Sequence, residues 1–565
     1  MKKKIILGVL FFCLSFKAQV FDFQKTFGGT SDDYFIKHIE SVDHNYVFTG
    51  STLSNNGDIT VNYGTKDVFL TKIDADGNYL WKKNFGGNND DVPLDIINSN
   101  DGGMILLSQS KSNTNFFTTN RGNNDLWVTK LDINGNMIWN KSIAGSGDES
   151  NVQIIPVTNG YVMAVNTNSN DFDFAHAGST GKDVWVIRID EAGNIVWKKL
   201  LQGSLDETSA KLKKINDNNF VVLVNSSSAD GDYSGNTVAG KNKGFLFKLD
   251  INENILMNSA IESSDIQQLN VANDVKIVND GYIITGTENF PYTASSGIIY
   301  ENYNAYFAKV SVAGSLTWKK YYMSGSSSDG IKDEGLFAEE TSDNNYVFFG
   351  NTGNPVGFSS GWMIKTDGAG NTVKYTPIPA YVKAMNKVQD GNFVINGYHY
   401  AGIPTHLGQF SLYIVFINSI GMNLFNPTYV LRSNQLYSDA RNTSLSVTND
   451  NKIISFWTDT YALVASPYNT NVWFSKFPIT VNFLSVNEEV SNKEKNNILV
   501  YPNPSSDYIK VSEKMEILIV YDTSGREVLR VSNTDVVDLR SLNSGNYILK
   551  IYNKEISNSY KIIKK

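Results

Sequence analysis

Paired carboxylates are the most frequent chemically capable groups in this sequence. They occur as adjacent acidic residues at Asp32-Asp33, Asp90-Asp91, Asp148-Glu149 and Asp206-Glu207. Two carboxyl groups at one site can perform the general acid and base steps of glycoside cleavage. These pairs recur every 58 residues, however, whereas an active site needs one copy of its residues. We therefore predict that they cap turns and accept hydrogen bonds from backbone N–H groups, including groups in neighbouring repeats.

Two further carboxylate pairs stand at alternate positions in polar loops. Asp171 and Asp173 lie in the segment DFDF, and Asp230 and Asp232 lie in ADGDYSGN. Hard oxygen ligands at alternate positions open the calcium loop of an EF-hand, although neither segment continues to the closing Glu of that loop. Two interpretations stay open here, a calcium site and ordinary Asx turns.

Other residues that commonly carry chemistry are scarce. The five histidines are His38, His44, His176, His399 and His406. None forms an H-E-x-x-H zinc motif, and no G-x-S-x-G elbow, Walker loop or G-x-G-x-x-G follows a predicted strand. His399 and His406 share one loop, where solvated histidines are more common than metal ligands. The sequence therefore predicts no catalytic residue and no cofactor-binding residue.

Composition and charge exclude several classes of protein. Hydrophobic residues make up 41% of the 565 residues, which is enough for a folded core and excludes wholesale disorder. The formal net charge is −8, so the chain lacks the basic balance of a typical nucleic-acid binder.

The N-terminus has the pattern of a secretory signal peptide at residues 1–18. Three lysines precede an apolar run over 5–16, and Ala18 and Gln19 flank the expected cleavage point. The run is shorter than the roughly 20 residues that span a bilayer. Cleavage would remove four lysines and shift the formal charge from −8 to −12. It would also remove Cys13, the single cysteine, so that disulfides and thiol chemistry are excluded from the mature chain.

The elements that must position these groups belong to an internal repeat over residues 20–480. Alternating runs open at Asp67, Asp125 and Asp183, and Trp81, Trp139 and Trp197 follow them at the same spacing of 58 residues. Later copies drift but continue, and the region accommodates about eight units. Each unit contains four short segments with strand alternation, separated by Asx and Gly turns.

Four antiparallel strands repeated about eight times predict an all-β fold, an eight-bladed β-propeller, with seven blades as the fallback. An open solenoid is the competing architecture, but its repeats are usually shorter. The region begins on VFDFQKTFGG (20–29) and ends on VWFSKF (472–477). Elsewhere in the repeat these two kinds of segment pair with each other, so we predict that they close the ring. The periodic tryptophans, including Trp318, are predicted to pack in the core.

The repeat resembles a known bacterial family. The matching pattern combines FGG-x-x-x-D-D, Y-V-x-x-G-S/N-T and D-x-F/W-x-x-K-I-D-x-x-G-N-x-x-W, and it is clearest in the first three units. It is similar to the bacterial β-propeller repeat called SBBP. That resemblance implies the propeller fold and no particular activity.

A second module follows a polar linker at residues 481–497. Residues 498–565 alternate in strand fashion between Pro-Asn-Pro, Thr-Ser-Gly and Asn-Ser-Gly turns, which predicts a small immunoglobulin-like β-sandwich. The module resembles the type A sorting domain (Por secretion tail) of the bacterial type IX secretion system. The residues that carry the resemblance are Tyr501, Pro502, Asn503, Pro504, Gly525, Gly545, Lys564 and Lys565. It implies recognition by the type IX machinery and release or attachment at the cell surface.

Two functional hypotheses remain. The favoured one is a secreted or surface-displayed propeller that binds a glycan or protein on its loop face without chemistry. The alternative is an extracellular polysaccharide hydrolase or lyase that uses loop carboxylates. Long loops at 113–125 and 288–304 mix aromatic and amide side chains, as binding loops do. Arg432, Asp439 and Arg441 have no counterparts in earlier repeats, so their convergence in a pocket would favour the enzyme.

Overall fold

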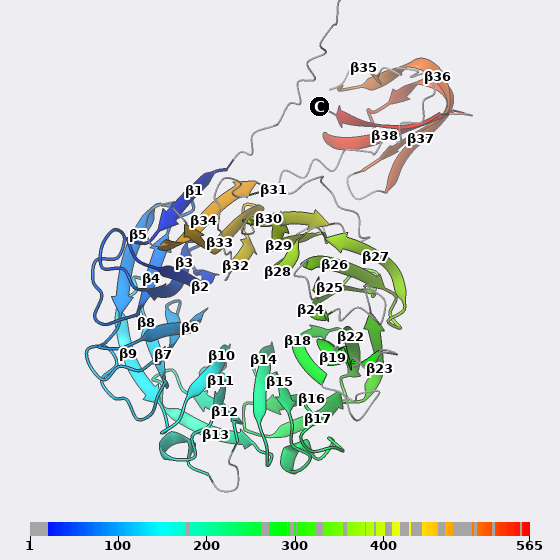
Figure 1. Ribbon diagram of the computed structural model, residues 1–565. Coiled ribbons are helices and arrows are strands. Elements are labelled where there is room, and N and C mark those ends of the chain that lie inside the picture. The colour runs from blue at the N-terminus through cyan, green and yellow to red at the C-terminus, as the bar shows by residue number, and fades with distance from the viewer. Residues whose placement is uncertain are drawn as a thin grey trace, which may run out of the picture. The chain divides into compact units, whose positions relative to one another are not determined.

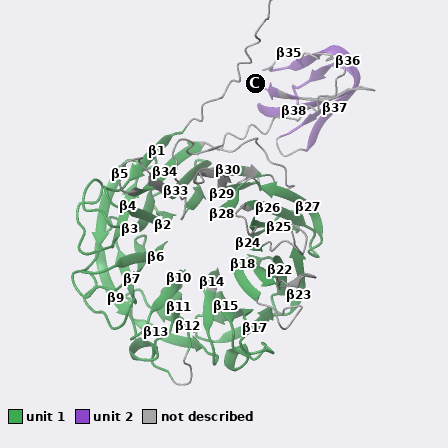
Figure 2. Ribbon diagram, viewed as in Figure 1, with its two compact units in different colours: residues 1–479 green, residues 480–565 purple. Residues whose placement is uncertain are grey.

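A computed structural model of the chain divides it into two compact units, Met1–Ile479 and Thr480–Lys565 (Figure 2). The structure describes residues 21–176, 181–261, 270–290, 292–293, 299–300, 302–322, 332–353, 359–378, 380–388, 391–401, 409–417, 429–430, 443–461, 469–478, 500–501, 505–522, 526–553 and 556–564. Within these ranges the helical segments are two 3₁₀ turns, η1 (Phe172–Phe174) and η2 (Gly231–Tyr233), and the fold is otherwise built from strands.

The first unit is a ring of antiparallel sheets, here called blades, arranged around a central axis (Figure 1). Four blades follow one another in sequence order: β2 (Asp33–Glu40), β3 (Tyr46–Thr52), β4 (Asp67–Ile73), β5 (Tyr79–Phe85); β6 (Asp91–Asn98), β7 (Met104–Ser110), β8 (Asp125–Leu131), β9 (Met137–Ile143); β10 (Glu149–Val157), β11 (Gly160–Thr167), β12 (Asp183–Ile189), β13 (Ile195–Leu201); and β14 (Glu207–Asn216), β15 (Asn219–Ser226), β16 (Lys243–Asp250), β17 (Ile255–Ile261).

The later strands of the ring continue this order. They are β18 (Asn270–Val278), β19 (Gly281–Asn289), β22 (Tyr303–Ser311), β23 (Leu316–Tyr322); β24 (Lys332–Glu340), β25 (Tyr346–Gly353), β26 (Ser359–Thr366), β27 (Thr372–Ile378); and β28 (Tyr381–Lys387), β29 (Phe393–Ala401), β30 (Gln409–Ile417), β31 (Tyr429–Val430). The sheet that contains β22 and the sheet that contains β24 are joined by one parallel bridge between Tyr303 and Lys332. A small hairpin of β20 (Tyr292–Thr293) and β21 (Ile299–Tyr300) is inserted between β19 and β22.

The last sheet of the ring closes it. It contains β32 (Thr443–Val447), β33 (Lys452–Tyr461) and β34 (Asn469–Pro478), and its fourth strand is β1 (Phe23–Phe27) from the other end of the unit. The pairing runs from Phe23 opposite Lys476 to Phe27 opposite Val472. The predicted pairing of these two segments is confirmed, and the repeat region forms a propeller-like ring.

The hydrophobic core lies between neighbouring blades. Val47 and Leu70 of the first blade form one buried cluster with Ile96 and Leu106 of the second. Central strands of the blades are buried along their length, polar residues included, because both of their faces are covered by adjacent blades. β4 shows this pattern, since all seven of its residues are buried.

At several seams the outer edges of neighbouring blades are joined through a turn and a tryptophan. In the turn before β13, Asp190 accepts hydrogen bonds from the backbone N–H groups of Ala192 and Asn194. Gly193 takes φ +75°, and a Cβ atom there would lie 2.8 Å from the ring of Trp139 in the preceding blade. Trp139 in turn donates to the carbonyl of Glu191 at 3.1 Å. The periodic tryptophans are therefore half-buried at the seams between blades, outside the deepest core.

The second unit has its own core. Its described strands are β35 (Val500–Tyr501), β36 (Tyr508–Tyr521), β37 (Glu527–Asp538), β38 (Gly545–Asn553) and β39 (Ile556–Lys564), and they form one connected antiparallel sheet. β36 pairs with β35, β37 and β38, and a cluster around Leu518, Val537 and Leu549 is buried. The sandwich arrangement within this unit stays a prediction.

Candidate functional site

The repeated acidic pairs are structural, and their two members have different roles. The second member lies inside its own blade: Asp33 is fully buried and accepts hydrogen bonds from the Gly29 N–H and from the Thr52 and Ser54 hydroxyls. The first member reaches the preceding blade, since Asp32 accepts from the Thr470 N–H at 2.9 Å. The same two patterns recur at the later pairs, with Asp91, Glu149 and Glu207 inside and Asp90, Asp148 and Asp206 between blades.

Burial controls the titration of the inner carboxylates. It raises the pKa of Asp33 to about 6, although the hydrogen bonds from Thr52, Gly29 and Ser54 oppose this. Burial likewise raises the pKa of Glu149 to about 7. Asp33 and Glu149 are enclosed and accept hydrogen bonds at both oxygens, so they hold loops in place and offer no exposed acid to a substrate.

The four aspartates with calcium-loop spacing contact backbone amides. Asp173 accepts from the Ala144 N–H at 3.0 Å and Asp232 from the Gln202 N–H at 2.9 Å. Asp171 and Asp230 accept from the N–H groups of Ser146 and Ser204. Among the described residues, no three His, Cys, Asp or Glu side chains gather as a metal site. Calcium at these four positions stays a prediction, and backbone carbonyls and water would have to complete any such site.

These aspartates belong to a loop that is repeated in four successive blades. The loop inserts one buried apolar residue into each blade, and these residues are Ile59, Phe117, Phe174 and Tyr233. In each loop, the residue immediately before this buried residue donates its backbone N–H to a backbone carbonyl at an earlier turn. The four pairs are Asp58 to Gly28, Phe116 to Gly86, Asp173 to Ala144 and Asp232 to Gln202. Three of the four equivalent positions are therefore aspartate, and the second blade alone among them has phenylalanine.

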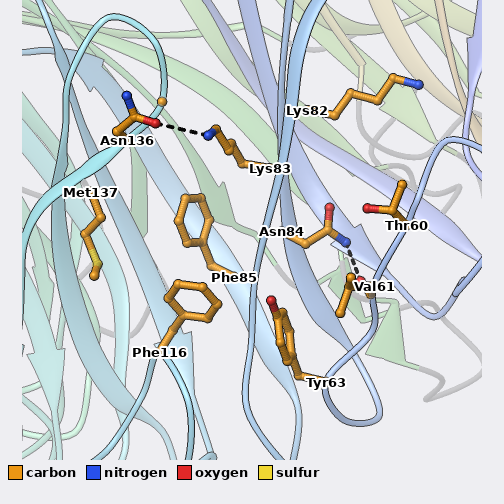
Figure 3. Close-up of a pocket in the computed structure, with 11 residues that line it drawn as sticks. Thr60, Val61, Tyr63, Lys82, Lys83, Asn84, Phe85, Phe116, Asn136 and Met137 are labelled. Carbon is orange, nitrogen blue, oxygen red and sulfur yellow. Dashed lines mark hydrogen bonds between the residues drawn. The ribbon is translucent and has the colours of Figure 1, made fainter.

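Phe116 produces a groove at the seam between the first two blades (Figure 3). Its ring packs edge-to-face against Tyr63 at 5.5 Å and against Phe85 at 5.3 Å between centroids. We call the hollow the seam groove; its volume is 360 Å³ and it is lined by Thr60, Val61, Tyr63, Lys82, Lys83, Asn84, Phe85, Phe116, Gly135, Asn136 and Met137. Such a volume is within the range of small-ligand sites.

Polar groups border the aromatic floor of the seam groove. Lys83 donates to the Asn136 side-chain oxygen at 3.1 Å, and Asn84 donates to the Val61 carbonyl at 2.8 Å, as Figure 3 shows. Lys82 points away from the rings and pairs with Asp58 at 2.6 Å. The groove thus combines aromatic surface with amide and ammonium donors held in fixed positions.

At the seam between the second and third blades, a salt bridge takes the place of the aromatic rings. Arg121 occupies the position equivalent to Tyr63, because both donate their backbone N–H to the aspartate that opens the following strand. Its guanidinium pairs with Asp173, the equivalent of Phe116, at 2.7 Å. A salt bridge therefore fills the place that aromatic rings line at the first seam.

Several predicted residues are placed elsewhere or not described. His38 is buried beside Ser446, His44 contacts Glu40, and His176 lies 3.1 Å from Asp183. Outside the described residues lie Ala18, Gln19, His406, Arg432, Asp439, Arg441, Pro502, Asn503, Pro504, Gly525 and Lys565. The predicted binding loop 113–125 supplies Phe116, whereas Tyr63 and Lys83 were missed. Tyr63 and Lys83 could have been found by comparing the residues at equivalent positions of the repeats.

In the second unit, the sorting-motif residues lie at strand ends. Gly545 begins β38 opposite Lys564 of β39, and Tyr501 ends β35 opposite Lys510 of β36. The Lys564 ammonium donates to the Ser506 carbonyl. The two ends of the module are therefore held together by its last described residue.

Comparison with known proteins identifies this module. Residues 499–565 match the secretion system C-terminal sorting domain. No curated protein matches the sequence. Within the described residues, no helix has the length and apolar character needed to cross a membrane. The sorting domain shows that the protein is secreted or held at the outer cell surface, and it implies recognition by the type IX secretion machinery.

Several solved structures are similar to the chain at low identity. Polysaccharide lyase Uly1 is 8% identical with a TM-score of 0.40, over 66% of this chain and 88% of that one. Puromycin hydrolase is 8% identical with a TM-score of 0.38, over 76% of this chain and 58% of that one. Extracellular domains 1-2 of Drosophila Semaphorin 1a are 8% identical with a TM-score of 0.37, over 66% and 85%. Likenesses at this level assign no function to the chain.

Proposed function

We propose that the mature protein is an eight-bladed, SBBP-type β-propeller that binds a glycan at the cell surface or outside the cell, without catalysing a reaction. The seam groove is its binding site. One observation carries this proposal: the second blade has Phe116 where three equivalent loops have aspartate, and this exchange exposes aromatic surface beside fixed amide groups.

Glycan binding fits the groove better than docking of a folded protein. Aromatic rings present flat apolar surfaces to the C–H faces of sugars, and amide and ammonium groups hydrogen-bond to hydroxyls. A stable protein interface buries about 800 Å² on each partner, which is a broad surface. The seam groove is instead a compact hollow of 360 Å³.

The carboxylates give no comparable support to a hydrolase or lyase. Asp33, Asp91, Glu149 and Glu207 are each fully buried. Asp173 and Asp232 accept backbone hydrogen bonds in loop positions that repeat along the ring. These six acids are therefore occupied in holding the fold.

The test is a panel of oligosaccharides applied to the full mature chain and to the Phe116→Asp variant. This variant restores the residue of the equivalent loops, so we expect it to fold with an unchanged circular dichroism spectrum. Its affinity for oligosaccharides should fall at least about tenfold, as expected for loss of a central aromatic contact. Leu80→Ala is the matched control, because Leu80 is an exposed apolar residue of β5 that does not line the groove. Equal binding by wild type and Phe116→Asp would contradict the proposal.

Export is tested separately by mass spectrometry of the protein from culture medium and washed cells. We expect a mature chain that begins near Gln19 and ends within residues 487–497. A full-length tail retained inside the cell would contradict the proposed processing.

A further inference from the structure

The charges around the seam groove are balanced within the protein. Lys82 is paired with Asp58 at 2.6 Å. Lys83 donates to Asn136, whose amide nitrogen donates to Asp132 at 2.9 Å. Lys82 thus has an ion-pair partner, and Lys83 is linked to Asp132 through the side chain of Asn136.

Lys83 and Asp132 also influence each other electrostatically. Slight burial acts to raise the pKa of Asp132, but hydrogen bonds from Asn136 and the positive charge of Lys83 outweigh it, and the pKa lies below its ordinary value. An anionic ligand beside Lys83 would therefore meet the negative potential of an ionised Asp132. At Lys82 it would compete with the carboxylate of Asp58.

The groups that remain for a ligand are uncharged or already neutralised. Tyr63 is 37% exposed and Met137 is 47% exposed, so the apolar floor is open to solvent. Asn84 uses its nitrogen on the Val61 carbonyl, which fixes the orientation of its side-chain oxygen as an acceptor. Hydroxyl groups satisfy both an amide acceptor and ammonium donors without changing the charge of the site.

We infer that the seam groove selects an uncharged oligosaccharide, with its C–H faces against Phe116 and Tyr63 and its hydroxyls toward Asn84, Asn136 and Lys83. This inference rests on the proposed function and adds the chemical class of the ligand. Acidic oligosaccharides, whether uronate or sulfated, bind more weakly because of the negative charges of Asp58 and Asp132.

The experiment compares neutral β-linked hexose oligosaccharides with oligogalacturonate and a sulfated oligosaccharide of equal length. Calorimetry on the full mature chain is run at about 0.02 M and about 0.5 M NaCl, where screening lengths differ several-fold. We expect the neutral ligand to bind with an affinity that changes less than about twofold with salt. Preference for an acidic ligand, lost at high salt and in Lys83→Gln, would overturn the inference.

The inference can also be tested with a variant that removes one negative charge beside the groove and should therefore bind an acidic ligand more tightly. Asp58→Asn keeps the shape of the side chain but removes the partner of Lys82. We expect oligogalacturonate binding to strengthen about three- to fivefold in this variant, while neutral binding stays unchanged. Unchanged oligogalacturonate binding would contradict the assigned role of Asp58. If no oligosaccharide of any class distinguishes wild type from Phe116→Asp, the proposed function itself fails.

Discussion

The ring of Phe116 meets the ring of Tyr63 edge-to-face at 5.5 Å, across the seam between two blades. One repeat later, the equivalent positions hold Asp173 and Arg121, which form an ion pair at 2.7 Å. The same backbone geometry thus supports an aromatic contact at one seam and a salt bridge at the next. The groove that we propose as a sugar site lies where the aromatic pair is present.

The first prediction concerns Tyr63. We expect Tyr63→Ala to weaken oligosaccharide binding about tenfold, because it removes one side of the aromatic floor. The unfolding free energy should fall by only about 1 to 2 kcal/mol, since the side chain is 37% exposed. Calorimetric titration and thermal melting measure the two effects. Loss of binding together with a large fall in melting temperature would show that Tyr63 supports the fold instead.

The second prediction concerns pH. Burial raises the pKa of Asp33 and Asp91 to about 6 and of Asp67, Glu149 and Glu207 to about 7. Because the folded pKa lies above the unfolded value near 4, their stabilising contribution is complete below about pH 4 and is lost as pH rises through 6 to 7. The melting temperature should therefore fall between about pH 4 and pH 7 and level off above that range.

The variant Asp33→Asn isolates one of these groups. Asn270 occupies the equivalent position of the β18 strand, where it stands opposite Glu288 and donates to its carboxylate, whereas Asp33 stands opposite Thr52. The variant should remove roughly 2 to 3 kcal/mol of the pH-dependent change in unfolding free energy. His38 acts in the opposite sense, because burial lowers its pKa to about 3 and its contribution is lost as pH falls from about 6.5. A melting temperature that rises between about pH 4 and pH 7 would contradict this account.

The third prediction concerns the turn glycine at Gly193. Gly193→Ala should destabilise the protein by more than the about 1 kcal/mol that a left-handed conformation costs, because the new Cβ would also meet Trp139 at 2.8 Å. Gly240→Ala is the matched control, since Gly240 has φ +82° and no atom within 4 Å of the added Cβ. Chemical denaturation compares the two. Equal costs would show that the tryptophan contact adds nothing.

The fourth prediction concerns Asp232. Its carboxylate accepts a hydrogen bond from the Gln202 N–H and orients the loop that carries the buried Tyr233. We expect Asp232→Ala to lower the unfolding free energy by about 1 to 2 kcal/mol, equally in calcium and in chelator. A melting temperature of the wild type that rises with calcium, and loses this rise in the variant, would support the calcium interpretation instead.

The sequence alone was sufficient for the architecture of the repeat region. A spacing of 58 residues places the Asp pairs, the Asp-opened strands and the tryptophans in register, and it predicted both four-stranded units and the pairing of β1 with β34. This succeeded because strand periodicity and turn chemistry are local properties that repetition amplifies. The sorting domain was likewise readable from local turns and its closing lysines.

The seam groove was decided by tertiary structure. Tyr63, Phe85, Phe116 and Met137 come from two blades and are brought together only when neighbouring blades pack. No periodicity in one strand reports which side chains meet across a seam, because that depends on the relative placement of two sheets. The sequence determined the repeating frame and the sorting domain that directs secretion. The packing of two blades around one exchanged residue determined where the seam groove lies.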